Sequence, residues 1–134
     1  MLISKTKYQL QKNDKLKSRK AIDSLFTKGK SFTNFPIRVT WAITENDIGL
    51  KAGFTASSKN FKKATDRNRI KRLMREAYRL QKNELQAQAL EQNKSINVFF
   101  IFTGKEVPKY NLVFDKMSVV LKQIKKLCDE KLNT

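Results

Sequence analysis

The sequence predicts a small α/β (α+β) two-layer sandwich, and two observations support this prediction. Segments with the two-residue period of a strand alternate along the chain with segments that have the 3.6-residue period of an amphipathic helix. The chain has 134 residues, of which 40% are hydrophobic, and this is enough for one domain with a core but too little for two. We therefore expect one small central sheet covered by helices, in the order helix, strand, strand, helix, strand, helix.

The first expected helix covers residues 18–28. Ser18 is a residue type that favours the N-cap, and Gly29 is placed to end the helix. Its apolar residues at helical spacing are Ile22, Leu25 and Phe26. Residues 1–17 are rich in Lys, Gln and Asn, so we expect a partly ordered basic arm ahead of a single α/β domain over residues 18–134.

Two strands with alternating apolar residues are expected to pair as an antiparallel hairpin. The odd positions are apolar in residues 35–43, and the even positions are apolar in residues 48–56. The polar segment 45–47 between them is typical of a turn. A third strand over residues 95–103 is apolar almost throughout, which is typical of a central strand covered on both faces.

Two longer helices complete the expected domain. The helix over residues 61–81 has an apolar side that should face the sheet, and a polar run over residues 86–94 should lead from it to the third strand. The apolar side consists of Ile70, Leu73, Met74, Ala77 and Tyr78. The final helix, over residues 111–131, carries the chain's single cysteine, Cys128, within its apolar stripe. We expect a buried structural thiol there, because one cysteine makes neither an internal disulfide nor a metal cluster.

Charge is the strongest indication of function. The chain has 29 Lys and Arg against 12 Asp and Glu, a formal charge of +17. Such an imbalance disfavours the compact state by self-repulsion unless a polyanion is a normal partner. We expect RNA rather than DNA. A membrane partner is the weaker alternative because no segment has the length of a spanning helix. The N-terminus lacks the apolar core of a signal peptide, so a cytoplasmic protein is expected.

The chain contains no histidine, and this absence argues against a catalytic site made by the protein alone. Histidine is the usual general base and the commonest zinc ligand. The acidic residues are scattered over different expected elements, without the clustered carboxylates that a metal-dependent nuclease needs. We therefore expect neither a catalytic residue nor a metal site within the polypeptide.

The helix over residues 61–81 concentrates the positive charge. Between Lys59 and Lys82 there are ten basic residues and only two acidic ones, Asp66 and Glu76. The candidate RNA-binding residues in this segment are Lys59, Lys62, Lys63, Arg67, Asn68, Arg69, Lys71, Arg72, Arg75 and Arg79. Most of them fall opposite the apolar side, and guanidinium groups present paired donors that suit phosphate. The plainer interpretation is a solvated charged face, which usually contains residues of both signs.

Aromatic and basic residues also lie together near the first helix. Phe26, Phe32 and Phe35 are close in sequence to Lys28, Lys30 and Arg38. Rings on which unstacked bases can lie, beside cations that follow the backbone, are typical of single-strand binding. Each ring could instead pack in the core, since small domains need their aromatics inside.

Two segments give the chain a family resemblance. They read GFTASSK over residues 53–59 and KKATDRNRIKRLMREAYR over residues 62–79. Shorter matches are LKSR at 16–19, LF at 25–26 and KGKSF at 28–32. With these motifs, and with an element order that matches over most of its length, the chain resembles the bacterial ribonuclease P protein component.

The resemblance implies a protein subunit of a ribonucleoprotein that removes the 5′ leader from precursor tRNA. In such an enzyme the RNA subunit holds the catalytic Mg²⁺ and cuts, while the protein assists. The resemblance further implies that the arginine-rich helix docks on the catalytic RNA, and that a cleft between the first helix and the sheet receives the single-stranded leader. It also implies a left-handed strand–helix–strand crossover, against the general preference.

Carried over by position, six residues should contact the RNA subunit or position the substrate: Arg67, Asn68, Arg69, Lys71, Arg72 and Arg75. Phe26 matches an aromatic of the leader cleft, to which Phe32, Lys30 and Arg38 are added as neighbours in the sequence. The chain departs from the family pattern at Ile22, Ser58 and Thr65, where a second Phe, a Lys and an aliphatic residue are usual. The alternative function is that of a structural RNA-binding protein of the ribosomal type.

Overall fold

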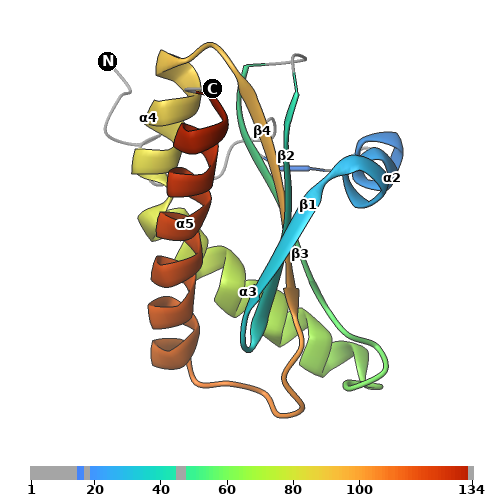
Figure 1. Ribbon diagram of the computed structural model, residues 1–134. Coiled ribbons are helices and arrows are strands. Elements are labelled where there is room, and N and C mark those ends of the chain that lie inside the picture. The colour runs from blue at the N-terminus through green and yellow to red at the C-terminus, as the bar shows by residue number, and fades with distance from the viewer. Residues whose placement is uncertain (1–14, 17–18, 45–47, 133–134) are drawn as a thin grey trace, which may run out of the picture.

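A four-stranded sheet with the order β1-β2-β4-β3 forms the centre of the molecule (Figure 1). The computed structural model describes residues 15–16, 19–44 and 48–132. The strands are β1 (Lys30–Asn34), β2 (Ile37–Thr44), β3 (Gly49–Ala56) and β4 (Ser95–Phe102). Helices α3, α4 and α5 lie on one side of the sheet and α2 on the other. The predicted α+β class with one small sheet is confirmed.

The predicted hairpin between residues 35–43 and 48–56 is wrong. β2 pairs antiparallel with β4, β3 pairs parallel with β4, and β2 and β3 therefore lie on opposite sides of β4. Alternation shows which face of a strand is buried, but it does not show which strand lies alongside. β4 takes the central place because it is apolar on nearly every residue, as predicted, and only the middle of the sheet covers both of its faces.

The hairpin that the chain does form joins β1 to β2. Asn34 pairs with Ile37 across a turn made by Phe35 and Pro36. β1 was not predicted, because its segment KSFTN contains a single apolar residue and polar edge strands lack a periodic signal. Phe35, expected at the start of a strand, lies in the turn and is 67% exposed.

Helix α2 (Arg19–Lys28) matches the first predicted helix. Ser18, its predicted N-cap, lies outside the described residues. Gly29 ends the helix as expected, and its N–H donates to the Leu25 carbonyl at 2.7 Å. A Cβ at Gly29 would collide with that carbonyl and lie 2.9 Å from the carbonyl oxygen of Trp41. Only glycine allows the chain to turn this closely from the helix into the sheet.

Two helices, and not one, connect the parallel neighbours β3 and β4. They are α3 (Ala64–Gln81) and α4 (Asn83–Glu91). The second was predicted as part of a polar run, since its periodicity is weak. Helix α3 begins three residues later than predicted because Phe61 is buried in the loop before it. Asn60 holds this loop by donating to the carbonyls of Thr103 and Gly104 at 3.1 and 3.2 Å. The left-handed sense of the crossover stays a prediction.

Helix α5 (Tyr110–Leu132) packs against α3 and completes the core layer (Figure 1). Its buried stripe is Val113, Met117, Val120, Leu121, Ile124 and Cys128. The predicted buried thiol is confirmed, since Cys128 is unexposed and reduced. The stripe faces the even-numbered side chains of β4, namely Ile96, Val98, Phe100 and Phe102, all of which are buried.

The odd-numbered side chains of β4 point to the face that α2 crosses, so this face is only partly covered. Phe99 and Ile101 are half-buried there. The outer edge of β3 is met by the chain ahead of α2, where the Leu16 N–H donates to the Ala52 carbonyl at 2.9 Å. The rest of the predicted arm lies outside the described residues. Within the described ranges, no helix is long and apolar enough to cross a membrane.

Candidate nucleic-acid interface

The core fixes which side of α3 meets solvent. Ile70 and Met74 are fully buried against the sheet and α5, together with Ala77 and Tyr78 one turn later. A helix held by this stripe must present its opposite side outward. The predicted apolar side is confirmed, with Leu73 half-buried at its margin.

Four exposed residues make up what we call the arginine face: Asn68, Arg69, Arg72 and Arg75. Within the described part of the chain, Arg69 and Arg72 contact no carboxylate and make no side-chain hydrogen bond. Arg75 lies over the Phe54 ring, with 5.8 Å between Cζ and the ring centroid. An aromatic face attracts the cation without neutralising it, so the guanidinium donors of all three arginines remain available to an external anion.

Arg67, which the sequence placed beside the arginine face, differs from the arginines of that face because its side chain has partners within the protein. Its Nη1 donates to the carbonyl of Phe61 at 2.6 Å and to that of Lys62 at 3.0 Å. These two carbonyls belong to the loop that enters α3. Part of this guanidinium is therefore engaged in holding the start of the helix.

Arg79 is neutralised within the protein. Its Nε donates to Glu76 Oε2 at 3.1 Å, and its Nη2 donates to Glu76 Oε1. The hydrogen bond from Arg79 lowers the pKa of the Glu76 carboxyl, and burial opposes it only in part. Lys82, counted among the basic residues of this segment, is buried, and its Nζ donates to Gln86 Oε1 at 2.7 Å. The exposed charge is therefore smaller than the sequence count.

Three of the four remaining predicted lysines lie just before the start of α3. Lys59, Lys62 and Lys63 are exposed on the loop that precedes the helix, and Lys71 is half-buried on the helix itself. The N-terminal end of a helix carries unpaired N–H groups and a partial positive charge. The lysines therefore add mobile cations to an end of α3 that already favours an anion.

A groove with aromatic walls adjoins the arginine face. Phe26 of α2 meets Phe99 of β4 edge to face, with 5.2 Å between the ring centroids. A Cβ at Gly53 would lie 2.5 Å from the Phe99 ring, so glycine makes room for this ring on the sheet. A cavity of about 380 Å³ opens beside it, lined by Ile22, Phe99 and Arg75 among others. Arg75 thus belongs to both the arginine face and the groove.

The structure brings together only part of the predicted leader cleft. Phe26 is 46% exposed, and Arg38 is exposed on the same face of the sheet, where it pairs with Ile101. Phe32 pairs with Val39 and packs toward the core on the opposite face. Lys30 pairs with Trp41 at the edge of the sheet. Phe32 therefore does not lie in the groove with Phe26.

Three residues of this region were not predicted as part of a binding site: Phe99, Gly53 and Phe54. Phe99 stands in an almost continuously apolar strand, where no period separates a core side chain from one on the open face. Side chains of a strand alternate between its two faces. Because Val98 and Phe100 are both buried in the core, Phe99 between them must lie on the opposite, open face. Among the described residues, no three acidic, histidine or cysteine side chains come close enough to hold a metal ion.

A small α+β domain with an unneutralised arginine face beside an aromatic groove is typical of proteins that bind nucleic acid. The family model of ribonuclease P matches residues 10–125. The chain belongs to this family.

The relatives agree with the family. The ribonuclease P protein component of Porphyromonas gingivalis is 32% identical over 84% of this chain and 83% of its own length. That of Chlorobium phaeobacteroides is 30% identical over 87% of this chain and 88% of its own. The Staphylococcus aureus RNase P protein has the same fold, with a TM-score of 0.67 at 22% identity over 84% of this chain and 95% of that one. The prediction of a protein component of an endoribonuclease is confirmed.

Proposed function

We propose that the arginine face binds the RNA subunit of ribonuclease P. The observation that carries this proposal is that Arg69 and Arg72 are exposed and have no carboxylate partner among the described residues. A chain with a formal charge of +17 gains stability from a polyanion at such a surface. Guanidinium groups bind phosphate oxygens through paired donors, and Asn68 can reach a ribose hydroxyl.

We propose that the groove beside the arginine face receives the single-stranded 5′ leader of precursor tRNA. Phe26 and Phe99 offer rings on which unstacked bases can lie, and Arg75 supplies a cation at the end of the groove nearest α3. Ile22 lines the groove where the family usually has a second aromatic. An aliphatic side chain packs against a base but does not stack on it as a ring does, so leader binding should depend strongly on Phe26.

In this proposal the polypeptide positions RNA and the RNA carries out the cleavage. The RNA subunit and substrate hold Mg²⁺, which supplies the activated water for hydrolysis. The part of the protein is to neutralise phosphate charge where two RNA molecules approach each other. This lowers the concentration of Mg²⁺ needed for cleavage, because protein cations replace counterions that the RNA would otherwise recruit.

The test is reconstitution of the full-length protein with its cognate ribonuclease P RNA at low Mg²⁺. We expect the protein to increase the rate of precursor-tRNA cleavage, and an Arg69→Ala/Arg72→Ala variant to lose most of that increase. Lys122→Ala/Lys126→Ala is the matched control, since both lysines are exposed on α5. The proposal is overturned by a rate that the wild-type protein leaves unchanged.

The groove has a separate test. Phe26→Ala removes one of its rings, and we expect it to weaken binding of leader-bearing precursor tRNA about tenfold, within the range of about 1–3 kcal/mol for a base on an aromatic ring. Mature tRNA, which lacks the leader, should bind equally well to variant and wild type. Equal losses on both RNAs would show that Phe26 only supports the fold. Phe35→Ala is a control with an exposed ring in the β1–β2 turn.

A further inference from the structure

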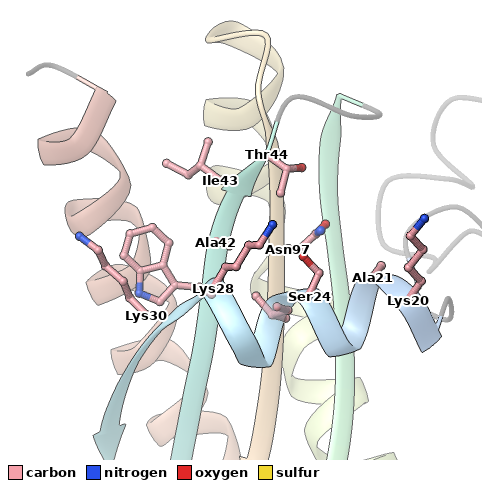
Figure 2. Close-up of a pocket in the computed structure, with 11 residues that line it drawn as sticks. Lys20, Ala21, Ser24, Lys28, Lys30, Ala42, Ile43, Thr44 and Asn97 are labelled. Atoms are coloured by element: carbon pink, nitrogen blue, oxygen red, sulfur yellow. The ribbon is translucent and has the colours of Figure 1, made fainter.

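A second cavity lies on the other side of α2 from Phe26. Ile22 and Phe26 form one side of the helix, while Lys20, Ser24 and Lys28 repeat at four-residue spacing on the opposite side. The cavity measures about 500 Å³, within the range of about 300–1,000 Å³ of small-molecule sites. Figure 2 shows α2 crossing the sheet below it, and the upper parts of β2 and β4 behind it.

The wall of this cavity carries positive charge without a balancing acid. Lys20, Lys28 and Lys30 all line it and are exposed. In the described part of the chain, none of these three lysines has a carboxylate within ion-pair distance. Figure 2 shows the amine of Lys28 near the side chains of Asn97 and Thr44, whereas Lys20 lies toward the other end of α2 and Lys30 extends away from the cavity. The ammonium group of Lys28 attracts an anion to the mouth and can donate to a phosphate, and the other two lysines add positive charge nearby.

The floor of the cavity holds polar oxygens that lack a donor. Asn97 of β4 is 8% exposed, and its Oδ1 has no hydrogen-bond partner. The Thr44 Oγ1 of β2 is likewise buried and unpartnered. Figure 2 places both side chains in the cavity above α2, near the end of Lys28. A buried oxygen without a donor is unfavourable, so these two atoms favour a ligand that brings N–H groups to the floor.

We propose that this cavity binds one nucleotide, with the base on the floor and the phosphate at the mouth beside Lys28. Every nucleobase carries an N–H or amino group on its Watson–Crick edge that can donate to Asn97 Oδ1, and Thr44 Oγ1 can donate or accept beside it. The phosphate then lies at the mouth, beside the ammonium group of Lys28. The site is separate from the arginine face and from the Phe26 groove, because α2 stands between them.

The chain contains its own reporter for this site. Its single tryptophan, Trp41, lines the cavity. A titration of the full-length protein with CMP, AMP, ribose 5-phosphate and inorganic phosphate should therefore be followed by tryptophan fluorescence. We expect the two nucleotides to bind at least tenfold more tightly than ribose 5-phosphate or inorganic phosphate, because only they bring a base to the floor. Equal affinities for all four compounds would overturn the proposal.

Variants test the floor and the mouth separately. Asn97→Leu keeps the volume but removes the acceptor, so it should weaken CMP about tenfold and leave inorganic phosphate unchanged. Thr44→Val is a second floor variant, should Asn97→Leu fail to fold. Lys20→Ala/Lys28→Ala should weaken both CMP and phosphate, while Lys122→Ala/Lys126→Ala on α5 should weaken neither. Floor variants that bind CMP as tightly as wild type would also overturn the proposal.

The nucleotide could be free or part of an RNA chain, and one comparison distinguishes the two. In an Arg72→Ala/Arg75→Ala background, which weakens the arginine face, the trinucleotide CpCpC is titrated beside CMP. Tighter binding of the trinucleotide assigns the cavity to RNA, and tighter binding of CMP assigns it to a free nucleotide. Either result supports a nucleotide site, whereas the absence of a saturable fluorescence change with both ligands contradicts it.

Discussion

At the scale of single residues, the arginines of α3 divide into those with an internal partner and those without one. The angular positions of the residues placed most of them correctly on the outer side of the helix. Positions alone did not show that Arg79 pairs with Glu76, although their three-residue spacing is a known signal for such pairs. The hydrogen bonds from Arg67 to two loop carbonyls could not be predicted from the sequence, because they depend on where the loop before α3 turns. The arginine face therefore lies where it was predicted, but it contains fewer residues than predicted, because Arg67 and Arg79 have partners within the protein.

Arg72→Ala and Arg75→Ala should each weaken binding to ribonuclease P RNA about tenfold, as expected for the loss of a charged hydrogen bond to phosphate. The slope of log K against log salt should fall by about one unit for each arginine that contacts one phosphate. Filter binding between 50 and 300 mM salt, about the range where screening changes most, measures both quantities. An unchanged slope would contradict phosphate contact, and Lys126→Ala on α5 provides the baseline.

Glu76→Gln should strengthen RNA binding, because it removes the carboxylate that neutralises Arg79. We expect a gain of about threefold and a salt slope about one unit steeper, as for one added phosphate contact. Acid should act in the same direction. Since Arg79 holds the Glu76 pKa below its usual value, the carboxylate keeps its charge, and the pair its stabilisation, until the pH falls below the ordinary range for Glu. An affinity equal to wild type at neutral pH would show that Arg79 does not reach RNA.

At the scale of elements, the sequence predicted the helices and strands that have a strong period and missed those that do not. The three apolar strands and three of the helices were found, whereas the polar strand β1 and the weakly amphipathic α4 were not. The predicted pairing of the strands was wrong for a different reason. Neighbours in sequence usually pair, but here β4 enters between β2 and β3, and only long-range packing decides that. The Phe26–Phe99 contact could not be predicted without this order.

Arg67→Ala should destabilise the protein, because two carbonyls at the start of α3 lose their donor. We expect a loss of about 1 kcal/mol in the free energy of unfolding, near the mean for a partly exposed hydrogen bond. Arg69→Ala, two residues further along the helix and exposed, should change it by less than about 0.5 kcal/mol. Urea denaturation followed by circular dichroism measures both. Equal stabilities of the two variants would mean that Arg67 does not anchor the loop.

At the scale of the whole molecule, the balance of charge sets how the fold responds to its surroundings. The chain carries 29 basic and 12 acidic residues, so most of its basic side chains have no acidic residue with which to pair. The ion pairs of the described residues include Arg79 with Glu76 and Lys125 with Glu84. Most of the excess charge therefore repels itself across the surface. The composition alone gave this net charge. It did not show how the charges are distributed between the arginine face and the cavity beside Asn97.

Salt should therefore stabilise the isolated protein. Raising the ionic strength from about 0.02 to 0.3 M shortens the Debye length to below about 10 Å, and we expect the Tm to rise by about 3–5 °C, which corresponds to about 1 kcal/mol for a chain of this size. A Lys122→Glu/Lys126→Glu variant carries less net charge and should respond less. A Tm that falls with added salt, or an equal response of both proteins, would contradict this explanation.

The short contact between Leu16 and β3 has a consequence for how molecules of this protein meet one another in solution. β3 is an outer strand of the sheet, and a bare outer strand offers unpaired N–H and carbonyl groups on which a second molecule can polymerise. The Leu16 N–H occupies the Ala52 carbonyl, in the middle of that row. Lys15 and Leu16 thus cover part of this edge, and a second copy of the chain finds fewer free backbone groups there with which to pair.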